Sequence, residues 1–221
     1  PLLVIIFISF LFAAEKNKNL NKSLLLFKTD KEIIIDGKVD EIWSTADSTT
    51  NFFQLDPYYN QPTSVKTVAK VLTTDEAIYC LMICYDDKRY IQANAGMQDA
   101  YTGDIVSIML DTFGDKQTAY KFAVNASGVK SDSRMRDDAR DRDYSWDGIW
   151  DAASQIYDWG YVVEIKIPYK LIKYDKNLSE WGLDFDRWRS YNKEDIYWCE
   201  YEQSEGQRIS KFGKLIFENF K

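Results

Sequence analysis

The chain has 221 residues, of which 45% are hydrophobic and 15% aromatic, so it can bury a sizeable core. Its formal net charge is −7, which argues against nucleic acid as a partner because phosphate backbones are bound by basic surfaces. The absence of histidine excludes Ser-His-type triads and the commonest zinc ligand. Carboxylate chemistry and cations held by oxygen ligands remain open.

The N-terminal segment is an apolar run from Leu2 to Ala14, followed by a polar stretch over residues 15–23. The run is too short to span a bilayer comfortably and ends in small residues, which is typical of a secretory signal peptide. A short buried strand or helix is the alternative. We expect residues 1–14 to be a signal-peptide remnant, 15–23 a polar linker and 24–221 one domain. A signal peptide implies a secreted, periplasmic or outer-membrane-associated protein.

Strand patterns dominate the rest of the chain. Apolar runs bounded by turn signals predict about ten strands, among them 24–28, 32–36, 64–72, 77–86, 104–112, 118–126, 160–168, 181–189 and 211–217. Residues 77–86 are apolar on both faces, which predicts a central strand covered on both sides. Residues 40–46 predict one or two helical turns with Asp40 as N-cap. The pattern predicts an all-β fold, an antiparallel β-sandwich of jelly-roll or immunoglobulin-like layers with one or two short helices.

The most charged stretch is SDSRMRDDARDRD, residues 131–143. Its charges alternate in sign without apolar periodicity, which favours a solvated loop. A long functional loop beside a binding face is the alternative. Cys80 and Cys84 lie four residues apart in one predicted strand, roughly 13 Å at 3.3 Å per residue, too far for a disulfide. Cys199 could pair with one of them, but we expect all three cysteines to be small buried hydrophobes.

Four segments in chain order resemble one family. They are IDGKVDEIWSTA (35–46), VLTTDEAIYCLMICYDD (71–87), GDIVSIMLDTFGDKQTAYKFAVNASGVKSD (103–132) and WDGIWDAASQIYDWGYVVEIKIPYKLI (146–172), the last followed by WGLDFDRWR (181–189). Together they resemble carbohydrate-binding module family nine, most closely the secreted domain of this type that precedes an outer-membrane β-barrel region in bacterial proteins. The resemblance covers roughly residues 31–217. It implies a β-sandwich that binds a polysaccharide or oligosaccharide without catalysis, holds structural calcium and continues covalently into an outer-membrane β-barrel.

Sugar rings have apolar C–H faces and polar hydroxyls, so a sugar site combines solvent-facing aromatic rings with amide or charged side chains. The resemblance implies that Tyr101 is one wall of the site and that Asn125 contacts the sugar. Trp181 is the candidate for the opposite wall, and Arg187 of the same predicted strand completes this part of the ligand-binding set. Trp181 fits the core equally well, and Asn125 fits a turn.

The segment YSWDGIWDA, residues 144–152, holds two further tryptophans. If a strand continues over residues 148–156, alternation directs Trp150 into the core. Trp146 precedes that strand at the end of the charged stretch. We therefore expect Trp150 to be structural and Trp146 to be exposed in a loop, where it can stack on a ligand.

Calcium binds about six to eight oxygen ligands. The resemblance implies calcium near the edge of the sandwich, and the candidate ligands are Asp36 and Asp40 in DGKVD and Asp111 and Asp115 in DTFGD. A turn followed by a helix cap explains DGKVD as well.

A glycosidase requires two carboxylates about 5–10 Å apart across a cleft. Asp104, Asp111 and Glu164 are available on predicted strands, but nothing singles out a pair, and Glu164 alternates with apolar residues as on a solvated sheet face. We therefore predict a non-catalytic, calcium-stabilised carbohydrate binder. Two alternatives are a cell-envelope interaction domain that serves as a lid for an outer-membrane β-barrel, and a stand-alone glycoside hydrolase.

Overall fold

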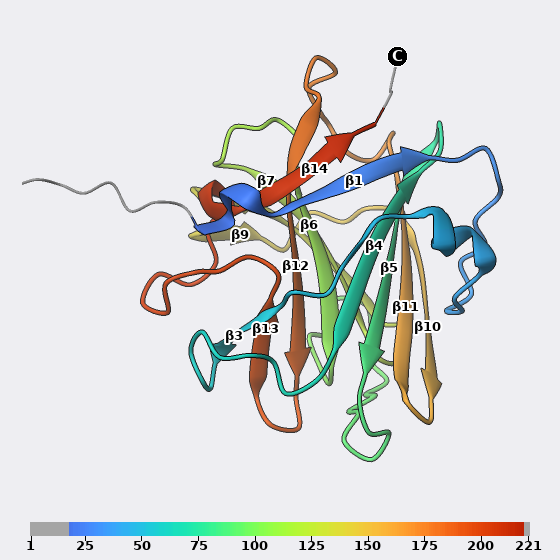
Figure 1. Cartoon of the computed structure of the whole chain (residues 1–221), viewed down its shortest axis with the longest axis vertical. Helices are drawn as coiled ribbons and strands as arrows, with labels where there is room; N and C mark the ends of the chain where they lie inside the picture. Colours follow the sequence, from blue (N-terminus) through green and yellow to red (C-terminus); the bar gives the residue numbers. More distant parts are fainter. Residues whose placement is uncertain (1–17, 219–221) are drawn as a thin grey trace, which may run out of the picture.

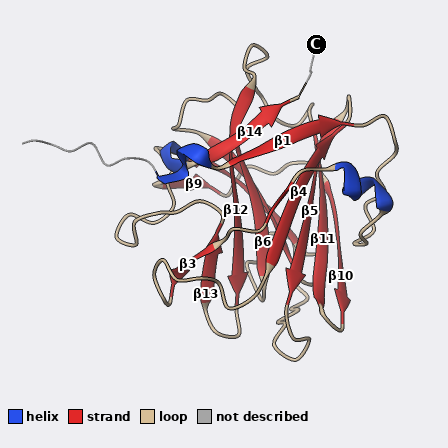
Figure 2. Ribbon diagram, viewed as in Figure 1, coloured by secondary structure: helices blue, strands red, loops and turns tan. Residues whose placement is uncertain are grey.

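The computed structural model describes residues 18–218, which consist almost entirely of strands and loops (Figures 1 and 2). Within this range the strands are β1 (Ser23–Lys28), β2 (Ser48–Thr49), β3 (Phe53–Asp56), β4 (Thr67–Thr73), β5 (Ala77–Tyr85), β6 (Ile105–Asp111), β7 (Ala119–Asn125), β8 (Lys130–Arg136), β9 (Asp141–Asp143), β10 (Asp151–Tyr157), β11 (Gly160–Pro168), β12 (Glu180–Arg189), β13 (Glu194–Tyr197) and β14 (Gly213–Phe217). The helices are short 3₁₀ segments, η1 (Lys18–Asn21), η2 (Glu41–Thr45) and η3 (Ile209–Lys211). This confirms the predicted all-β sandwich class.

The strands form one curled sheet in the order β10-β11-β5-β4-β1-β14-β12-β6-β7-β8-β9. Most neighbours are antiparallel, but β1 is parallel to both β14 and β4. Its first residues pair with β14 and its last two with β4, so β1 passes from one layer to the other across the top of Figure 1. The expectation of a purely antiparallel sandwich misses these pairs, because they join β1 to strands that lie far along the chain, β4 and β14.

The central strand β5 is buried on both faces, as predicted. Cys80 and Met82 face the main core between the layers, whereas Tyr79 and Leu81 belong to a second cluster with Trp43 of η2. Asp40 is the N-cap residue of η2 but makes no side-chain cap bond. All three cysteines are free and buried, which confirms their expected role as small hydrophobes.

The charged stretch 131–143 is not a solvated loop but a hairpin of β8 and β9. Asp132 and Met135 are buried, and Arg136 forms an ion pair with Asp143 across the hairpin. The sequence pattern predicts that these charged side chains are solvated. The prediction fails because ion pairs and hydrogen bonds with other parts of the chain stabilise them in the folded protein. Another predicted strand, residues 32–36, is irregular chain between β1 and η2.

The N-terminal predictions fall partly outside the described residues. The expected signal-peptide remnant, residues 1–14, lies wholly outside and stays a prediction. Residues 18–23 of the expected linker lie against the domain, since they form η1 and the start of β1, and Asn19 is buried with hydrogen bonds to the backbone of Glu200 and Lys211. Among residues 18–218 there is no helix long and apolar enough to cross a membrane.

Candidate binding site

The candidate site begins with a buried ion pair between two central strands. Lys121 of β7 donates a hydrogen bond of 2.6 Å to Asp186 of β12, although the residues are 65 positions apart. Strand alternation places both on the sheet face opposite to Phe122 and Phe185, which belong to the main core. β6 lies between the two strands and contributes Ser107, directly opposite Asp186. The Lys121–Asp186 pair thus forms a buried, charged floor on this face of the sheet.

Two exposed tyrosines lie at this floor. Lys121 Nζ is 5.9 Å from the centroid of the Tyr101 ring, and Tyr101 is 41% exposed. The Tyr144 ring, 57% exposed, meets Tyr101 edge to face with a centroid distance of 6.3 Å. The sequence predicts Tyr101 as one wall of a sugar site, and in the structure the Tyr144 ring packs against it. Exposed aromatic rings beside charged groups are the combination that a sugar site requires.

Further ionisable groups surround the Lys121–Asp186 pair. Burial opposes the charge of Lys121, but the Asp186 carboxylate outweighs it and raises the pKa of Lys121. Arg142 of β9 has a raised pKa because Tyr197, Tyr144 and Asp186 outweigh its burial. Burial and the nearby Asp186 carboxylate raise the pKa of Asp195 to about 7. The floor therefore offers two charged donors, one carboxylate and one carboxyl group that titrates near neutral pH.

Trp181 cannot be the opposite wall for Tyr101. In the antiparallel pair of β6 and β12, Trp188 lies opposite Ile105 and Gly182 lies opposite Asp111. Tyr101 precedes the first residue of β6, whereas Trp181 lies beside its last, about 20 Å away at 3.3 Å per residue. Trp181 is 3% exposed and packs against other rings. The prediction was wrong because both residues start a strand, and antiparallel pairing places two strand starts at opposite ends.

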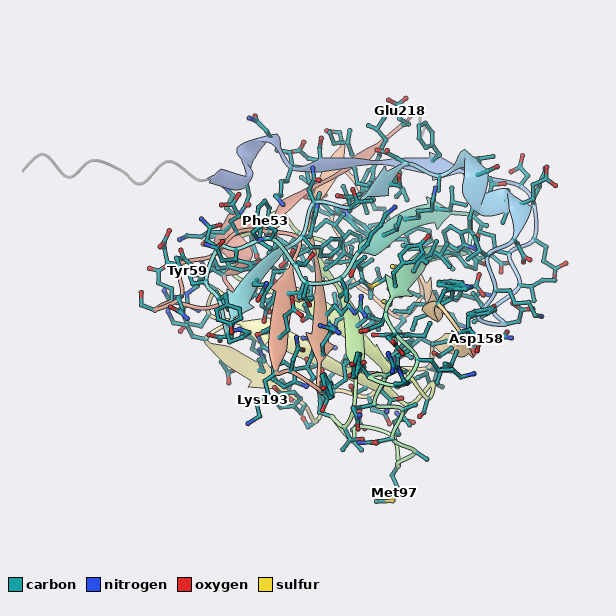
Figure 3. All side chains as sticks on the ribbon, turned by 60° about the horizontal axis from the view of Figure 1, so that its bottom comes forward. Phe53, Tyr59, Met97, Asp158, Lys193 and Glu218 are labelled. Atoms are coloured by element: carbon teal, nitrogen blue, oxygen red, sulfur yellow. The ribbon has the colours of Figure 1, made fainter. Side chains whose placement is uncertain are left out.

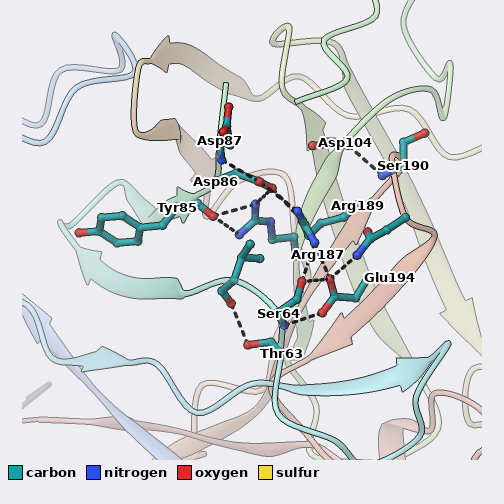
Figure 4. Close-up of polar contacts among 12 residues, drawn as sticks. Thr63, Ser64, Tyr85, Asp86, Asp87, Asp104, Arg187, Arg189, Ser190 and Glu194 are labelled. Atoms are coloured by element: carbon teal, nitrogen blue, oxygen red, sulfur yellow. Dashed lines mark hydrogen bonds and ion pairs between the residues drawn. The ribbon is translucent and has the colours of Figure 1, made fainter. Parts of the chain in front are cut away.

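Arg187, a predicted ligand-binding residue, is buried away from the candidate site. Its guanidinium is fully buried, bonds to Asp86, Thr67 and the backbone oxygens of two neighbours, and stacks over the Tyr161 ring. Arg189 shares Asp86 with it, as Figure 4 shows. This network ties β12 to the end of β5 and cannot contact a ligand at the surface.

Asn125 is buried and fully hydrogen-bonded. Its amide donates to the backbone oxygens of Asn94 and Thr102 and accepts from the N–H groups of Ser127 and Val129. These bonds complete a turn after β7 and hold the loop that leads to Tyr101. The structure therefore favours the turn interpretation of Asn125 and gives it an indirect, positioning role. The tip of the same loop, Met97, projects from the body of the molecule (Figure 3).

The two tryptophans of YSWDGIWDA differ in burial, since Trp150 is buried and Trp146 is half-buried. Trp150 is 1% exposed, donates to Asp132 at 2.6 Å and packs edge to face on Phe122, which confirms it as a core residue. Trp146 is half-buried rather than loop-exposed. It packs against Tyr120 and Phe122, with the Arg134 guanidinium 5.2 Å from its ring centroid. The segment crosses the face of β7 and β8, a contact that sequence adjacency does not reveal.

The predicted calcium ligands are occupied by the chain itself. Asp111 accepts from the backbone of Phe113 and Lys116, and Asp115 accepts from Gln117 and Thr118. Asp36 is paired with Lys38, and Asp40 does not join it in a cluster. Within residues 18–218 no three His, Cys, Asp or Glu side chains are grouped so that they could hold a metal. These carboxylates make hydrogen bonds or ion pairs within the chain, and structural calcium stays a prediction.

The carboxylates that could have served a hydrolase are buried apart from one another. Glu164 accepts from the N–H groups of Asp36 and Gly37 and from the Trp43 indole. Its expected solvated face is covered by η2, so burial raises its pKa. Asp104 accepts from the Ser190 N–H (Figure 4). None of these groups presents an open pair across a cleft.

Sequence reasoning missed Tyr144, Lys121, Arg142 and Asp186. A signal existed for one of them, since Lys121 is the one charged residue of its strand, AYKFAVN. Trp188, two residues after Asp186, shares its sheet face and is half-buried, so it extends the candidate surface.

Residues 35–219 match the family described as carbohydrate family 9 binding domain-like. The chain belongs to this family. Domains of the family are non-catalytic binding modules.

Three relatives extend the comparison. Exoglucanase XynX of Acetivibrio thermocellus is 26% identical over 195 residues, which cover 83% of this chain but 16% of the exoglucanase. A carbohydrate binding module family 9 from Caldicellulosiruptor kristjanssonii has been solved with cellotriose (TM-score 0.64, 23% identity, 90% of this chain and 95% of that chain). A carbohydrate binding module family 9 from the same organism, solved with glucose, gives a TM-score of 0.64 and 22% identity over 90% of this chain and 97% of that chain. At these identities the solved structures establish the fold alone.

Proposed function

We propose that this domain binds carbohydrate without catalysis, at the surface where Tyr101 and Tyr144 meet the Lys121–Asp186 pair. The observation that carries the proposal is the placement of two exposed rings beside a buried, charged floor. Stacked C–H faces remove apolar area from water, and the charged groups hydrogen-bond hydroxyls. The two relatives solved with cellotriose and glucose make glucose-based oligosaccharides the first ligands to test.

The expected affinity follows from the exposed ring area. A tyrosine side chain offers about 200 Å², of which 57% is open at Tyr144. A sugar over one face covers about half of that and buries a similar area of its own, so about 100 Å² leaves water. At about 25 cal/mol per Å² this gives at most about 2.5 kcal/mol, and about 1–2 kcal/mol once polar atoms are discounted. Dissociation constants between micromolar and millimolar follow when a few hydrogen bonds are added.

Calorimetric titration of the purified chain with glucose, cellobiose and cellotriose tests the proposal. We expect binding by the unmodified chain and a loss of about 5- to 30-fold in affinity for Tyr144→Ala or Tyr101→Ala, the equivalent of about 1–2 kcal/mol. The matched control is Phe113→Ala, an aromatic residue with 44% exposure that follows the far end of β6. Equal losses in all three variants, or the absence of binding to a wider sugar panel, would refute the assignment.

We also propose that the protein is secreted and continues into an outer-membrane β-barrel. The apolar run over residues 2–14 supports secretion, and the family resemblance supports a continuation into an outer-membrane β-barrel. Fractionation of the native host tests the location, and co-purification with a barrel domain tests the continuation. Calcium stabilisation is proposed from the resemblance, and the melting temperature with and without a chelator tests it.

A further inference from the structure

A second concave site lies at the opposite end of the domain from Tyr101. It is a pocket of about 500 Å³ between the end of β1, the turn between β4 and β5, the segment 169–181 and the end of β14. This volume is within the usual range of about 300–1,000 Å³ for small-molecule sites. In Figure 1 these elements meet at the top, whereas the loop before β6 lies at the bottom. The two sites are therefore separated by the length of β6.

Four aromatic side chains line this pocket and contact one another. The Trp181 ring centroid is 5.4 Å from Tyr174, 6.5 Å from Tyr169 and 5.2 Å from Phe217. Tyr169 and Tyr174 are half-buried, so part of each side chain remains open to the pocket. Trp181 is among the residues that sequence reasoning assigned to ligand binding, and this pocket is where the fold places it.

Trp181 also carries an unmet hydrogen-bonding need. Its indole N–H is buried and has no acceptor among the described residues. A buried donor without an acceptor is unfavourable, and most such groups in folded proteins find a protein, water or ligand partner. Because Trp181 lines the pocket, a hydroxyl group of a ligand held there is a candidate acceptor.

The rim of the pocket is polar and carries no net charge. Lys28 and Asp75 form an ion pair of 2.6 Å, and Lys176 and Asp175 add one positive and one negative charge. Asn177 donates its side-chain amide to Asp175, which places an amide group on the rim. A rim with balanced charge favours neither an anion nor a cation, whereas aromatic walls and a polar rim suit the faces and hydroxyls of an uncharged sugar.

We propose that this pocket is a second saccharide site, which takes one or two rings of an uncharged sugar. The proposal adds a site to the proposed function and does not depend on the Tyr101–Tyr144 surface. Two sites at opposite ends of one domain would let it hold two chains, or two segments of one chain, with an avidity above that of either site.

Nuclear magnetic resonance titration of the full chain separates the two sites. The readout is the Trp181 indole N–H resonance, assigned with Trp181→Phe, and the reference is the Trp150 indole, which is buried and bonded to Asp132. We expect glucose, cellobiose or cellotriose to shift the Trp181 resonance in a saturable way and leave the Trp150 resonance in place. Tyr174→Ala should weaken this response at least tenfold, and Asn177→Ala, which alters an exposed rim residue, should weaken it without affecting the fold.

The variants also distinguish failure of the two proposals. Tyr144→Ala should leave the Trp181 response unchanged, and Tyr174→Ala should leave binding at the Tyr101–Tyr144 surface unchanged. A Trp181 resonance that ignores every neutral sugar at tens of millimolar overturns the second site, whatever happens at the first. A response to glucosamine or glucuronate alone also overturns it, because the proposal specifies an uncharged ligand.

Discussion

The raised pKa of Asp195 leads to a prediction about how the free energy of unfolding depends on pH. It lies on β13, opposite Trp188 of β12 and Asp56 of β3. Burial, together with the negative charges of Asp186 and Asp56, raises the pKa of Asp195 to about 7, although Lys121 and the Tyr197 hydroxyl oppose the rise. In the unfolded chain an aspartate titrates near 3.9. The folded protein therefore holds this proton more tightly than the unfolded chain does.

The sign of the effect follows from that difference. Stability contributed by a raised carboxyl pKa is fully present below about pH 4 and is lost as the pH rises through about 7. Between pH 5 and pH 8 the loss is about 3 kcal/mol, since pH 5 lies about two units below the folded pKa and each unit is worth 1.36 kcal/mol. Asp184, whose pKa burial raises to about 6, acts in the same direction and contributes about 1 kcal/mol.

Asp195→Asn removes this titration while keeping the size of the side chain. Urea unfolding followed by tryptophan fluorescence at several pH values should show that the variant loses about 3 kcal/mol less than the unmodified protein between pH 5 and pH 8. Asp158→Asn is the control, because its carboxylate forms an exposed ion pair with Lys88 and should leave the pH dependence unchanged. Parallel pH profiles for the unmodified protein and Asp195→Asn would refute the argument.

Two further predictions concern groups that hold the fold together. Glu164→Ala leaves three donors without an acceptor, two of them in buried hydrogen bonds, so urea unfolding should show a loss of about 3–5 kcal/mol, with a smaller loss for Glu164→Gln, which keeps one acceptor. A loss below about 1 kcal/mol for Glu164→Ala would contradict this role. The family resemblance predicts structural calcium, with Asp111 and Asp115 among its candidate ligands, so chelation by EDTA should lower the melting temperature and added calcium should restore it; an unchanged melting temperature would refute this part of the proposal.

Local pattern predicts the strands of this protein well and their partners poorly. The apolar run of β5 predicts that both faces of this strand are buried. It does not indicate which other elements bury them. The charges of residues 131–143 predict solvent exposure. The local pattern does not show that the Trp150 indole donates a hydrogen bond to Asp132, or that Arg136 forms an ion pair with Asp143. Pairing of β1 with β14 is equally invisible to local pattern, since it joins segments almost two hundred residues apart.

The candidate site shows the same division. The resemblance points to Tyr101, which lies at a loop-to-strand junction and is exposed in the structure. Lys121 and Asp186 become a site only when β6 pairs with β7 and with β12. Asn125 and Arg187 are residue types that often bind sugars. In this protein, however, their side chains form hydrogen bonds within the chain and so stabilise the fold.

Composition and alternation by themselves determine that this chain is an all-β protein with a large aromatic inventory and no histidine chemistry. Tertiary structure decides which rings stay in water and which charges lie beneath them, because long-range pairing sets the neighbours of every side chain. It also decides that Trp181 and Tyr101 belong to opposite ends of the domain. The direction of one antiparallel pair, β6 with β12, is the physical reason.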